Sequence, residues 1–355
     1  MARSYANLWP LVVSWENLVA AYRKCRRRKR YKRGAAEFDF NWESNLLSLR
    51  QELIDGSYRP GTYRNFYIVD PKPRKISAAP FRDRVLHHAV VRVLEPIYER
   101  RFIFDSYACR RGNGTHRAIV RAQQLLRRYN YCLQTDIVRF FPNVDHQVLL
   151  QLLGRIVRDW RLHALVSIII ESGRCVLEEE ASHCYFPGDD LFAASRPKGL
   201  PIGNLTSQFF ANVLLDQIDH FVKEQLRVSG YVRYADDLLL FGSSKAELWR
   251  MRDELVKRLA ALRLCLHGDK TQVRPCRCGV KFLGFILQRS GRRLQQSAWR
   301  RFNSRLKHLK WEWGHGMASS QTVRQSLQAW HAHTSEINSR GMQKMVMLRL
   351  CFRRN

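Results

Sequence analysis

Three aspartates could do chemistry together. Asp136 ends a hydrophobic segment, and the adjacent pair Asp236 and Asp237 lies between two other apolar segments. If a tight turn joins those two segments, both carboxylates of the pair can point the same way, and Asp136 beside them would complete a cluster. Such a cluster binds hard divalent cations, and two cations stabilise the attacking and leaving oxygens of a phosphoryl displacement. The three residues therefore predict that chemistry, although an aspartate pair by itself is also common in ordinary turns.

The strands that must hold these carboxylates can be predicted from the hydrophobic pattern. Residues 131–141 are expected to form a strand that ends in an aspartate, and residues 231–242 to form two strands that meet at a polar turn. We expect a basic hairpin within residues 63–84, an exposed hairpin at the acidic residues 178–190 and a strand over 281–287.

Helical periodicity accounts for most of the remaining chain. Asp83 and Asp145 stand where side-chain caps of two of these helices are expected. The segments predicted to be helical are residues 11–22, 41–54, 85–102, 116–128, 146–158 and 245–262, together with a long helix that follows a glycine-rich turn within 199–226.

The charge balance predicts a partner of opposite charge. The 355 residues include 61 Lys and Arg against 31 Asp and Glu, which gives a net charge of +30, while 45% of the chain is hydrophobic. A chain this apolar folds, and a surface this basic favours phosphate backbones over the weaker alternative of a membrane surface. There is no apolar run long enough to span a bilayer and no signal-peptide pattern, and the nine cysteines are scattered. We therefore expect a cytoplasmic protein that binds nucleic acid and no membrane.

The residues around the aspartate pair carry a family resemblance. Tyr234-Ala-Asp-Asp between two apolar strands resembles the active-site motif of reverse transcriptases, and the resemblance extends in order from about residue 40 to 290. It implies an α+β fold, a right-hand polymerase with fingers, a palm made of an antiparallel sheet plus helices, and a small helical thumb. The implied domains are a basic N-terminal helix or extension at 1–34, fingers at 35–130, palm at 131–290 with the acidic insert 178–190, and thumb at 291–355.

The same resemblance implies roles for individual residues. Asp136 and Asp236 would hold two Mg²⁺ ions, with Asp237 assisting and the Ile137 carbonyl as a further ligand. Phe141 would block a ribose 2′-OH, or else simply pack in the core. The residues implied to bind the incoming nucleotide are Lys72, Arg74, Arg82, Phe141, Ile202, Gly203, Gln208 and Lys270. The implied primer grip is Phe282, Leu283 and Gly284, and the nucleic-acid-binding residues in the basic segment are Arg26, Arg27, Arg28, Lys29 and Arg30.

One motif indicates a subclass. Intron-type and retron enzymes have Gln-Gly-x-x-x-Ser-Pro where this chain has Ile202-Gly-x-x-x-Ser-Gln208, a form similar to that of reverse transcriptases of diversity-generating retroelements. Ile supplies only apolar contact, so a polar check on the nascent base pair is lost. The resemblance implies error-prone cDNA with misincorporation opposite template adenines, for targeted gene diversification. It also implies a bacterial or phage-encoded enzyme whose partners are a template RNA, an RNA/DNA hybrid, dNTPs and a small basic oligomeric accessory variability protein.

Two alternatives stay open. One is another intron-derived or defence-associated reverse transcriptase without a mutagenic role, and the other is a non-catalytic RNA-binding scaffold. The residues after 290 suffice for a thumb and are too few for an RNase H or HNH-type domain, so we expect target cleavage to be left to other proteins. A zinc site at Cys265, His267, Cys276 and Cys278 is disfavoured, because the spacing lacks a CxxC pair.

Overall fold

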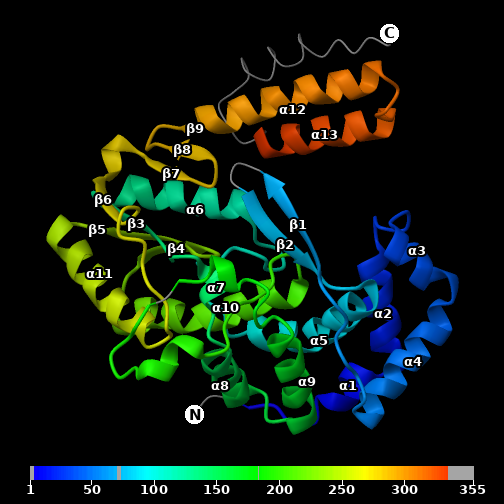
Figure 1. Cartoon of the computed structure of the whole chain (residues 1–355). Coiled ribbons are helices and arrows are strands. Elements are labelled where there is room, and N and C mark those ends of the chain that lie inside the picture. The colour runs from blue at the N-terminus through cyan, green and yellow to red at the C-terminus, as the bar shows by residue number, and fades with distance from the viewer. Residues whose placement is uncertain (1–3, 70–72, 183, 335–355) are drawn as a thin grey trace. The chain divides into compact units, whose positions relative to one another are not determined.

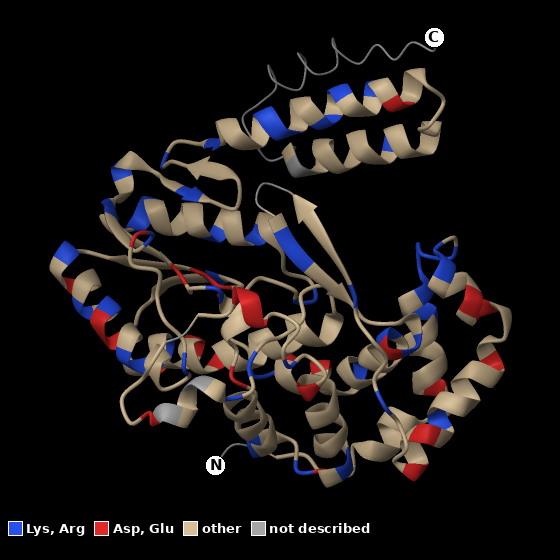
Figure 2. Cartoon of the chain, in the orientation of Figure 1, with Lys and Arg blue, Asp and Glu red and all other residues tan. Residues whose placement is uncertain are grey.

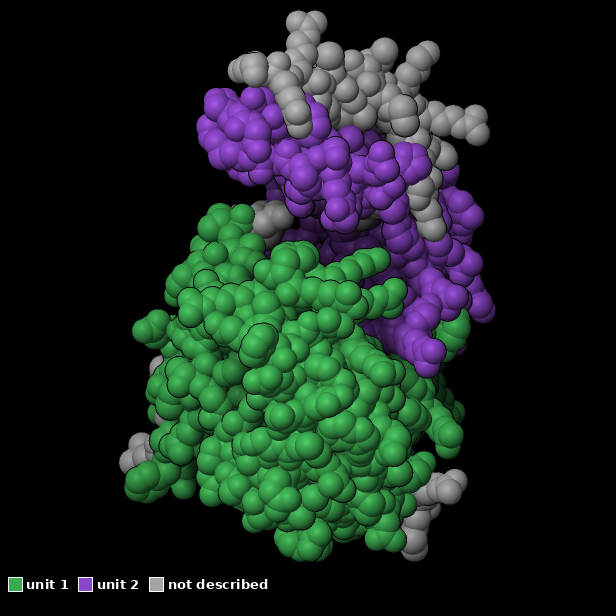
Figure 3. All heavy atoms as spheres, turned by 90° about the vertical axis from the view of Figure 1, so that its right-hand side faces the viewer, with its two compact units in different colours: residues 1–104, 136–227, 253–268 green, residues 105–135, 228–252, 269–355 purple. Residues whose placement is uncertain are grey.

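The computed structural model describes residues 4–69, 73–182 and 184–334 (Figure 1). The chain forms two compact units, each assembled from three separate stretches of sequence (Figure 3). Unit 1 comprises Met1–Phe104, Asp136–Arg227 and Asp253–Gly268, and unit 2 comprises Asp105–Thr135, Val228–Arg252 and Asp269–Asn355.

Unit 1 is mostly helical and carries one two-stranded ribbon, in which β1 pairs antiparallel with β2. Its elements are α1 (Trp9–Val13), α2 (Trp15–Arg26), α3 (Arg33–Phe40), α4 (Trp42–Asp55), β1 (Arg64–Val69), β2 (Pro73–Ala78), α5 (Phe81–Glu99), α7 (Phe140–Asn143), α8 (His146–Ile156), α9 (Trp160–Glu171), the short 3-10 helices η1 (Glu178–Glu180) and η2 (Leu191–Ser195), α10 (Leu205–His220) and the π-helical turn η3 (Phe221–Gln225).

Unit 2 contains two sheets, whose strand orders are β4-β5-β3-β6 and β7-β8-β9. Its elements are α6 (Thr115–Arg128), β3 (Tyr131–Asp136, whose last residue already counts with unit 1), β4 (Gly230–Tyr234), β5 (Asp237–Gly242), β6 (Gln272–Pro275), η4 (Cys276–Cys278), β7 (Val280–Phe282), β8 (Phe285–Leu287), β9 (Arg292–Leu294), α12 (Gln296–Gly314) and α13 (Ser320–Thr334). Helix α11 (Lys245–Ala260) starts in unit 2 and ends in unit 1.

The core of unit 2 forms where α6 packs against both sheets. Ala118, Ala122 and Leu126 recur on one face of α6 and are completely buried, because a repeat of four residues keeps side chains on one side of a helix. They share a cluster with Val232 of β4 and Leu287 of β8. The ladders of β3 with β6, β4 with β5, and β7 with β8 are all antiparallel. The predicted mixed helix and sheet fold with antiparallel sheets is therefore confirmed.

Three local expectations were wrong. The helix α5 begins at Phe81, so Asp83 lies inside its first turn; its buried carboxylate instead accepts hydrogen bonds from the Tyr58 hydroxyl and the Gly61 amide. Residues 281–287 form two short strands joined by a turn rather than one strand. In the acidic insert, the residues described (178–182 and 184–190) form no strand, because side chains from elsewhere, such as Asn143 bonding the Ser182 amide, bind its backbone.

No helix within the described ranges is both long enough and apolar enough to cross a lipid bilayer.

Candidate active site

The aspartate pair lies at the tip of the β4–β5 hairpin. The register pairs Tyr234 with Asp237, so the loop consists of Ala235 and Asp236 alone. The strands form because β5 continues into four consecutive apolar residues that are all buried, so both faces of the strand lie in the core: Leu238, Leu239, Leu240 and Phe241. Both aspartates are half-buried at the end of this apolar hairpin. The predicted turn between two apolar strands is thus present.

A strained backbone and a buried arginine hold this hairpin tip. Ala235 has φ +55°, a value that residues with a Cβ rarely adopt but that the first position of a two-residue hairpin loop requires. The guanidinium of Arg233, which has no exposed surface, donates to the Ala235 carbonyl at 3.2 Å and to the Ser106 hydroxyl at 2.8 Å. Arg233 thereby ties the strained loop to the segment before α6. Arg233 is not among the residues predicted from the sequence, although a charged residue inside an apolar strand is a signal that could have identified it.

Asp136 ends β3, and the sheet order places β3 beside β5, the strand that begins at Asp237. Thr135, the residue before it, shares a hydroxyl–hydroxyl hydrogen bond of 2.7 Å with Thr271. Beyond the strand, the Asp136 carbonyl accepts from the His267 amide at 2.8 Å and the Val138 amide donates to the Cys265 carbonyl at 2.9 Å. These two bonds do not involve the carbonyl of the buried residue Ile137, the further metal ligand that the resemblance implied.

The donor chemistry of the three aspartates fits a hard cation, because all three offer only carboxylate oxygens. No cluster of three or more His, Cys, Asp or Glu side chains that could hold a metal ion was found among the residues that the structure describes. The two-ion site at Asp136, Asp236 and Asp237 therefore stays a prediction.

Phe141 lies just after this strand, on the short helix α7. It is half-buried, and its ring meets that of the buried Phe140 edge-on at 5.3 Å between centroids. Arg139 begins the turn with φ +42°, and the Phe141 carbonyl accepts from the Leu200 amide at 2.9 Å. Phe140 therefore contacts one side of the ring while part of the residue stays accessible, and its role as a steric gate stays a prediction.

The Ile202–Gln208 stretch, here called the IGxxxSQ segment, forms a turn and the first residues of α10 in unit 1. Ile202 is half-buried, while Gly203 and Gln208 are exposed. Gly203 has φ +113°, and a Cβ there would lie 2.8 Å from Cγ2 of Ile76 on β2. The segment is therefore tightly packed against β2, and glycine is the residue that the backbone requires at this position.

The cations predicted to bind the triphosphate differ in their surroundings. Arg74 is exposed on β2, and Lys270 is exposed after α11. Arg82 donates to the Glu52 carboxylate at 2.6 Å, and its guanidinium lies over the Tyr58 ring at 5.1 Å from the centroid. Lys72 lies outside the described residues. Binding of nucleotide by these residues stays a prediction, and Arg82 has an intramolecular partner in this structure.

The predicted primer grip is the turn of the β7–β8 hairpin. Phe282 is buried, whereas Leu283 and Gly284 form the turn with φ +48° and +87°. Among the described residues, apart from its chain neighbours, no atom lies within 4 Å of the place where a Cβ on Gly284 would stand, so there is room beside its Cα, while its carbonyl accepts from the Gln295 amide at 3.0 Å.

The basic segment joins α2 to α3, where Figure 2 shows a stretch of ribbon coloured blue for Lys and Arg. Arg27, Arg28 and Arg30 are exposed. Arg26 instead forms an ion pair with Asp39, and Lys29 is half-buried. Three of the five predicted residues are therefore free to project from the surface, whereas Arg26 is used inside the fold.

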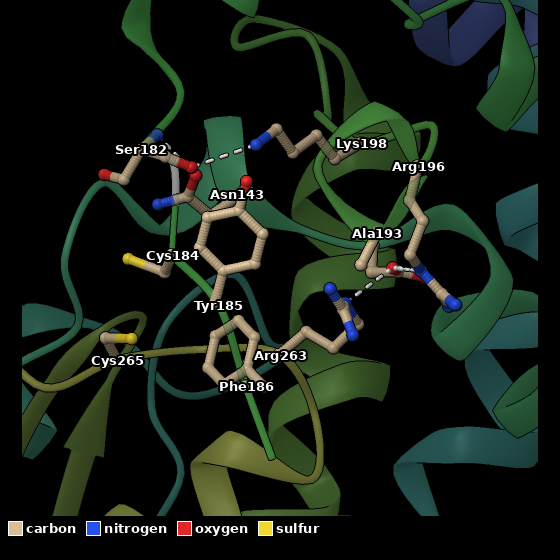
Figure 4. Close-up of a pocket in the computed structure, with 11 residues that line it drawn as sticks. Asn143, Ser182, Cys184, Tyr185, Phe186, Ala193, Arg196, Lys198, Arg263 and Cys265 are labelled. Carbon is tan, nitrogen blue, oxygen red and sulfur yellow. Dashed lines mark hydrogen bonds and ion pairs between the residues drawn. The ribbon is translucent and has the colours of Figure 1, made fainter. Parts of the chain in front are cut away.

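Asp145 does more than the helix capping that was predicted. Its side chain accepts from the Val148 amide at 2.9 Å, which confirms the cap of α8. The same carboxylate pairs with Arg196 at 2.6 Å and with Arg263 at 3.2 Å. Figure 4 shows the side chains of both arginines. This network fastens α8, which follows Phe141, to two distant segments, and no residue near Asp145 in the sequence indicates it.

Comparison with known proteins matches residues 69–287 to the family described as Reverse transcriptase (RNA-dependent DNA polymerase). Protein YkfC of Escherichia coli (strain K12) is 27% identical over 317 residues, which cover 75% of this chain and 80% of that protein. The group II intron-encoded protein LtrA of Lactococcus lactis subsp. cremoris is 27% identical over 183 residues, covering 51% of this chain but only 28% of LtrA. A solved structure of apo telomerase from Candida Tropicalis, truncated from the C-terminal domain, aligns with a TM-score of 0.48 at 13% identity, covering 71% of this chain and 60% of that chain.

The family match spans more than half of the chain, from the end of β1 to the end of β8, and contains all three predicted carboxylates. Family membership implies an RNA template and nucleic-acid substrates. The chain therefore belongs to the reverse transcriptases, the family of RNA-directed DNA polymerases.

Proposed function

We propose that this chain synthesises error-prone cDNA on a template RNA for targeted gene diversification, with misincorporation concentrated opposite template adenines. The observation that carries the subclass is the IGxxxSQ segment, in which Ile202 replaces the glutamine and Gln208 replaces the proline of the intron-type motif. Ile202 is half-buried in a turn fixed against β2, so its side chain offers a firmly placed apolar surface and no hydrogen bond.

The chemistry we propose is two-metal nucleotidyl transfer. Asp136, Asp236 and Asp237 would hold two Mg²⁺ ions, supported by the all-carboxylate donor set and by the sheet order, in which the strand ending at Asp136 neighbours the strand beginning at Asp237. The ions, when bound, supply charge stabilisation for the attacking and leaving oxygens. Because the hairpin loop is strained at Ala235 and anchored by Arg233, the aspartates are set in place before substrate arrives.

Other residues of this chain would select and hold the substrate. Phe141 would exclude the ribose 2′-OH with a ring that Phe140 supports from one side. Exposed Arg74 on β2 and exposed Lys270 would bind phosphate oxygens. The room beside the Cα of Gly284 would receive the primer end. The exposed arginines at 27, 28 and 30 would contact template RNA through its phosphates.

The absence of a hydrogen-bonding side chain at Ile202 explains the proposed misincorporation. A site that hydrogen-bonds its substrate rejects wrong substrates because buried polar groups would be left unpaired, whereas an apolar side chain imposes no such penalty. We propose that this enzyme works with a structured template RNA and a small basic oligomeric accessory variability protein in a bacterial or phage-infected cell.

A separate observation favours a second candidate function. The similarity to LtrA, a group II intron-encoded protein, favours an intron-type reverse transcriptase without a mutagenic role. The two candidates differ in one measurable property, because only the first predicts errors that depend on the template base.

Sequencing of the cDNA separates them. The purified chain is given primed RNA of known sequence, Mg²⁺ and dNTPs, and the error frequency at each template base is compared among the wild type, Ile202→Gln and Ile202→Leu. We expect the wild type and Ile202→Leu to make errors chiefly opposite adenines, and Ile202→Gln to make them about tenfold less often, because the amide restores a polar check. An accurate wild-type product, or errors that Ile202→Gln leaves unchanged, would contradict the diversification role.

A further inference from the structure

A buried asparagine joins the IGxxxSQ segment to the β1–β2 ribbon. Asn204 is 2% exposed and comes directly after Gly203. Its Oδ1 accepts from the Ala79 amide at 3.1 Å, and its Nδ2 donates to the Ser77 carbonyl at 2.8 Å. The Ser77 amide in turn donates to the Ile202 carbonyl at 2.9 Å. All these residues belong to unit 1.

The side chain of Asn204 takes the place of a peptide group in a sheet. One edge of β2 pairs with β1. At Ser77, and at Ala79 just beyond the strand, the other edge is paired by the Ile202 carbonyl and the Asn204 carboxamide. A carboxamide, like a peptide group, offers an N–H donor and a C=O acceptor. The Asn204 side chain therefore continues the row of hydrogen bonds along β2 beyond Ile202, where the backbone of the turn diverges from the strand. The IGxxxSQ segment is thereby hydrogen-bonded to β2 like a short neighbouring strand.

This connection leaves little room for independent movement. Ser77 is completely buried and Ala79 is 4% exposed, so breaking the bonds to Asn204 would leave a donor and an acceptor unpaired away from water. Close packing adds to this, since Ile76 lies within 2.8 Å of where a Cβ on Gly203 would stand. The ribbon and the IGxxxSQ segment therefore move together.

We infer that Asn204 is a positioning residue that sets the nucleotide site by locking the IGxxxSQ segment to β2. This inference rests on the proposed function, in which β2 carries Arg74 against the triphosphate and the segment carries Ile202 beside the nascent base pair. The carboxamide of Asn204 does not touch the nucleotide; it fixes the distance between the residues that do. Without it, the two sets of contacts are no longer pre-organised for one substrate.

Ser207 provides a matched control from the same turn. Its hydroxyl is buried and donates to the Pro201 carbonyl at 2.7 Å, and Asn204 Nδ2 also donates to that carbonyl, at 3.1 Å. Asn204→Ala and Ser207→Ala therefore both remove a buried bond within the turn. Only Asn204→Ala also removes the bond to Ser77 of β2 and the bond to Ala79, the residue just after β2.

The test is single-nucleotide insertion on primed RNA, with KM and kcat for the correct dNTP measured separately and thermal unfolding followed in parallel. We expect Asn204→Ala to raise KM about tenfold with kcat changed less than about twofold, because a binding contact common to ground and transition states is loosened. Ser207→Ala is expected to keep the wild-type KM. Amide exchange in peptides that cover β2 should become faster in Asn204→Ala and stay unchanged in Ser207→Ala.

A less disruptive substitution keeps the test informative if Asn204→Ala fails to fold. Asn204→Ser keeps one hydroxyl, which can bond the Ala79 amide or the Ser77 carbonyl but not both, so its KM is expected between those of the wild type and Asn204→Ala. Equal KM values for Asn204→Ala and Ser207→Ala, or a change in kcat alone, would overturn the positioning role. If the wild type itself makes no DNA from dNTPs, the proposed function fails instead, and the exchange measurement still reports on the link to β2.

Discussion

At the scale of single residues, strain accompanies three of the segments predicted to act on nucleic acid. Ala235 precedes Asp236, Arg139 precedes the Phe140–Phe141 pair, and Leu283 lies in the predicted primer grip; all three have positive φ without being glycine. Such conformations persist only where surrounding contacts enforce them. The sequence identified the carboxylates and the aromatic ring by residue type, but backbone strain has no residue-type signal at an alanine, an arginine or a leucine.

The sugar selectivity predicted for Phe141 belongs to this scale. Phe141→Ala removes a ring that is partly exposed and supported by Phe140, which opens space for a 2′-hydroxyl. We expect discrimination between dNTPs and ribonucleotides, measured as the ratio of kcat/KM values, to fall by about tenfold or more. Phe141→Tyr keeps the ring and is expected to keep the discrimination. Unchanged selectivity in Phe141→Ala would mean that the ring only fills the core.

At the scale of elements, the sequence predicted what local signals determine. The β4–β5 hairpin, the α8 cap at Asp145 and the amphipathic helix α6 were all predicted, because each depends on residues close together in the chain. What depends on distant partners was not predicted. Asp83 failed as a cap because Tyr58 and Gly61 bind its carboxylate.

In the candidate site, too, local features were predicted and long-range contacts were not. Residue types identified its three aspartates and the turn that presents two of them, whereas the partners that hold it are separated by long stretches of chain. Asn204 reaches Ser77 of β2 across 127 residues, and Arg233 reaches Ser106 across 127. Such contacts follow from the tertiary fold, and no periodicity or spacing within a single segment encodes them.

Gly203 offers a test of how closely the IGxxxSQ segment packs on β2. Gly203→Ala places a Cβ at φ +113° and 2.8 Å from Ile76, so we expect it to lower the free energy of unfolding by about 2 kcal/mol or more. Gly34→Ala, in α3 with its nearest atom at 3.9 Å and no positive φ, is the control and should be neutral or stabilising. Denaturant unfolding measures the free energy of unfolding of both variants. If Gly203→Ala were as stable as Gly34→Ala, the turn would have moved away from β2 without cost.

At the scale of the whole molecule, two features stand out: the large positive net charge, and the assembly of each compact unit from stretches that alternate along the chain. Each unit is built from three stretches of the sequence, so neither can be separated by a single cut. The net charge of +30 was visible in the composition and suits a nucleic-acid substrate. The division into these units was not visible, because it depends on contacts between stretches far apart.

Stability should fall in mild acid because α5 buries a histidine. Burial, with smaller contributions from His88 and Arg84, lowers the pKa of His87 from 6.5 to about 3. Below pH 6.5 this imidazole becomes protonated in the unfolded chain but stays neutral in the folded chain. Lowering the pH from 7 to 5 therefore decreases the free energy of unfolding by about 2 kcal/mol through this group.

His87→Leu tests that dependence. Denaturant unfolding at both pH values should show that the variant loses about 2 kcal/mol less than the wild type over this interval. The exposed His331 is the control, and His331→Gln should follow the wild type. If His87→Leu has the same dependence as the wild type, His87 is not the group that titrates.

The most direct test of the account is RNA-templated DNA synthesis by the purified chain. Primed RNA, Mg²⁺ and dNTPs are supplied to the wild type, to Asp236→Asn and to Asp55→Asn, an exposed aspartate at the end of α4. We expect primer extension by the wild type and by Asp55→Asn. We expect a loss of about a thousandfold or more in Asp236→Asn, because an amide cannot replace the charge of a metal-binding carboxylate. Extension by Asp236→Asn at the wild-type rate would contradict the assignment of the β4–β5 hairpin tip as the catalytic centre.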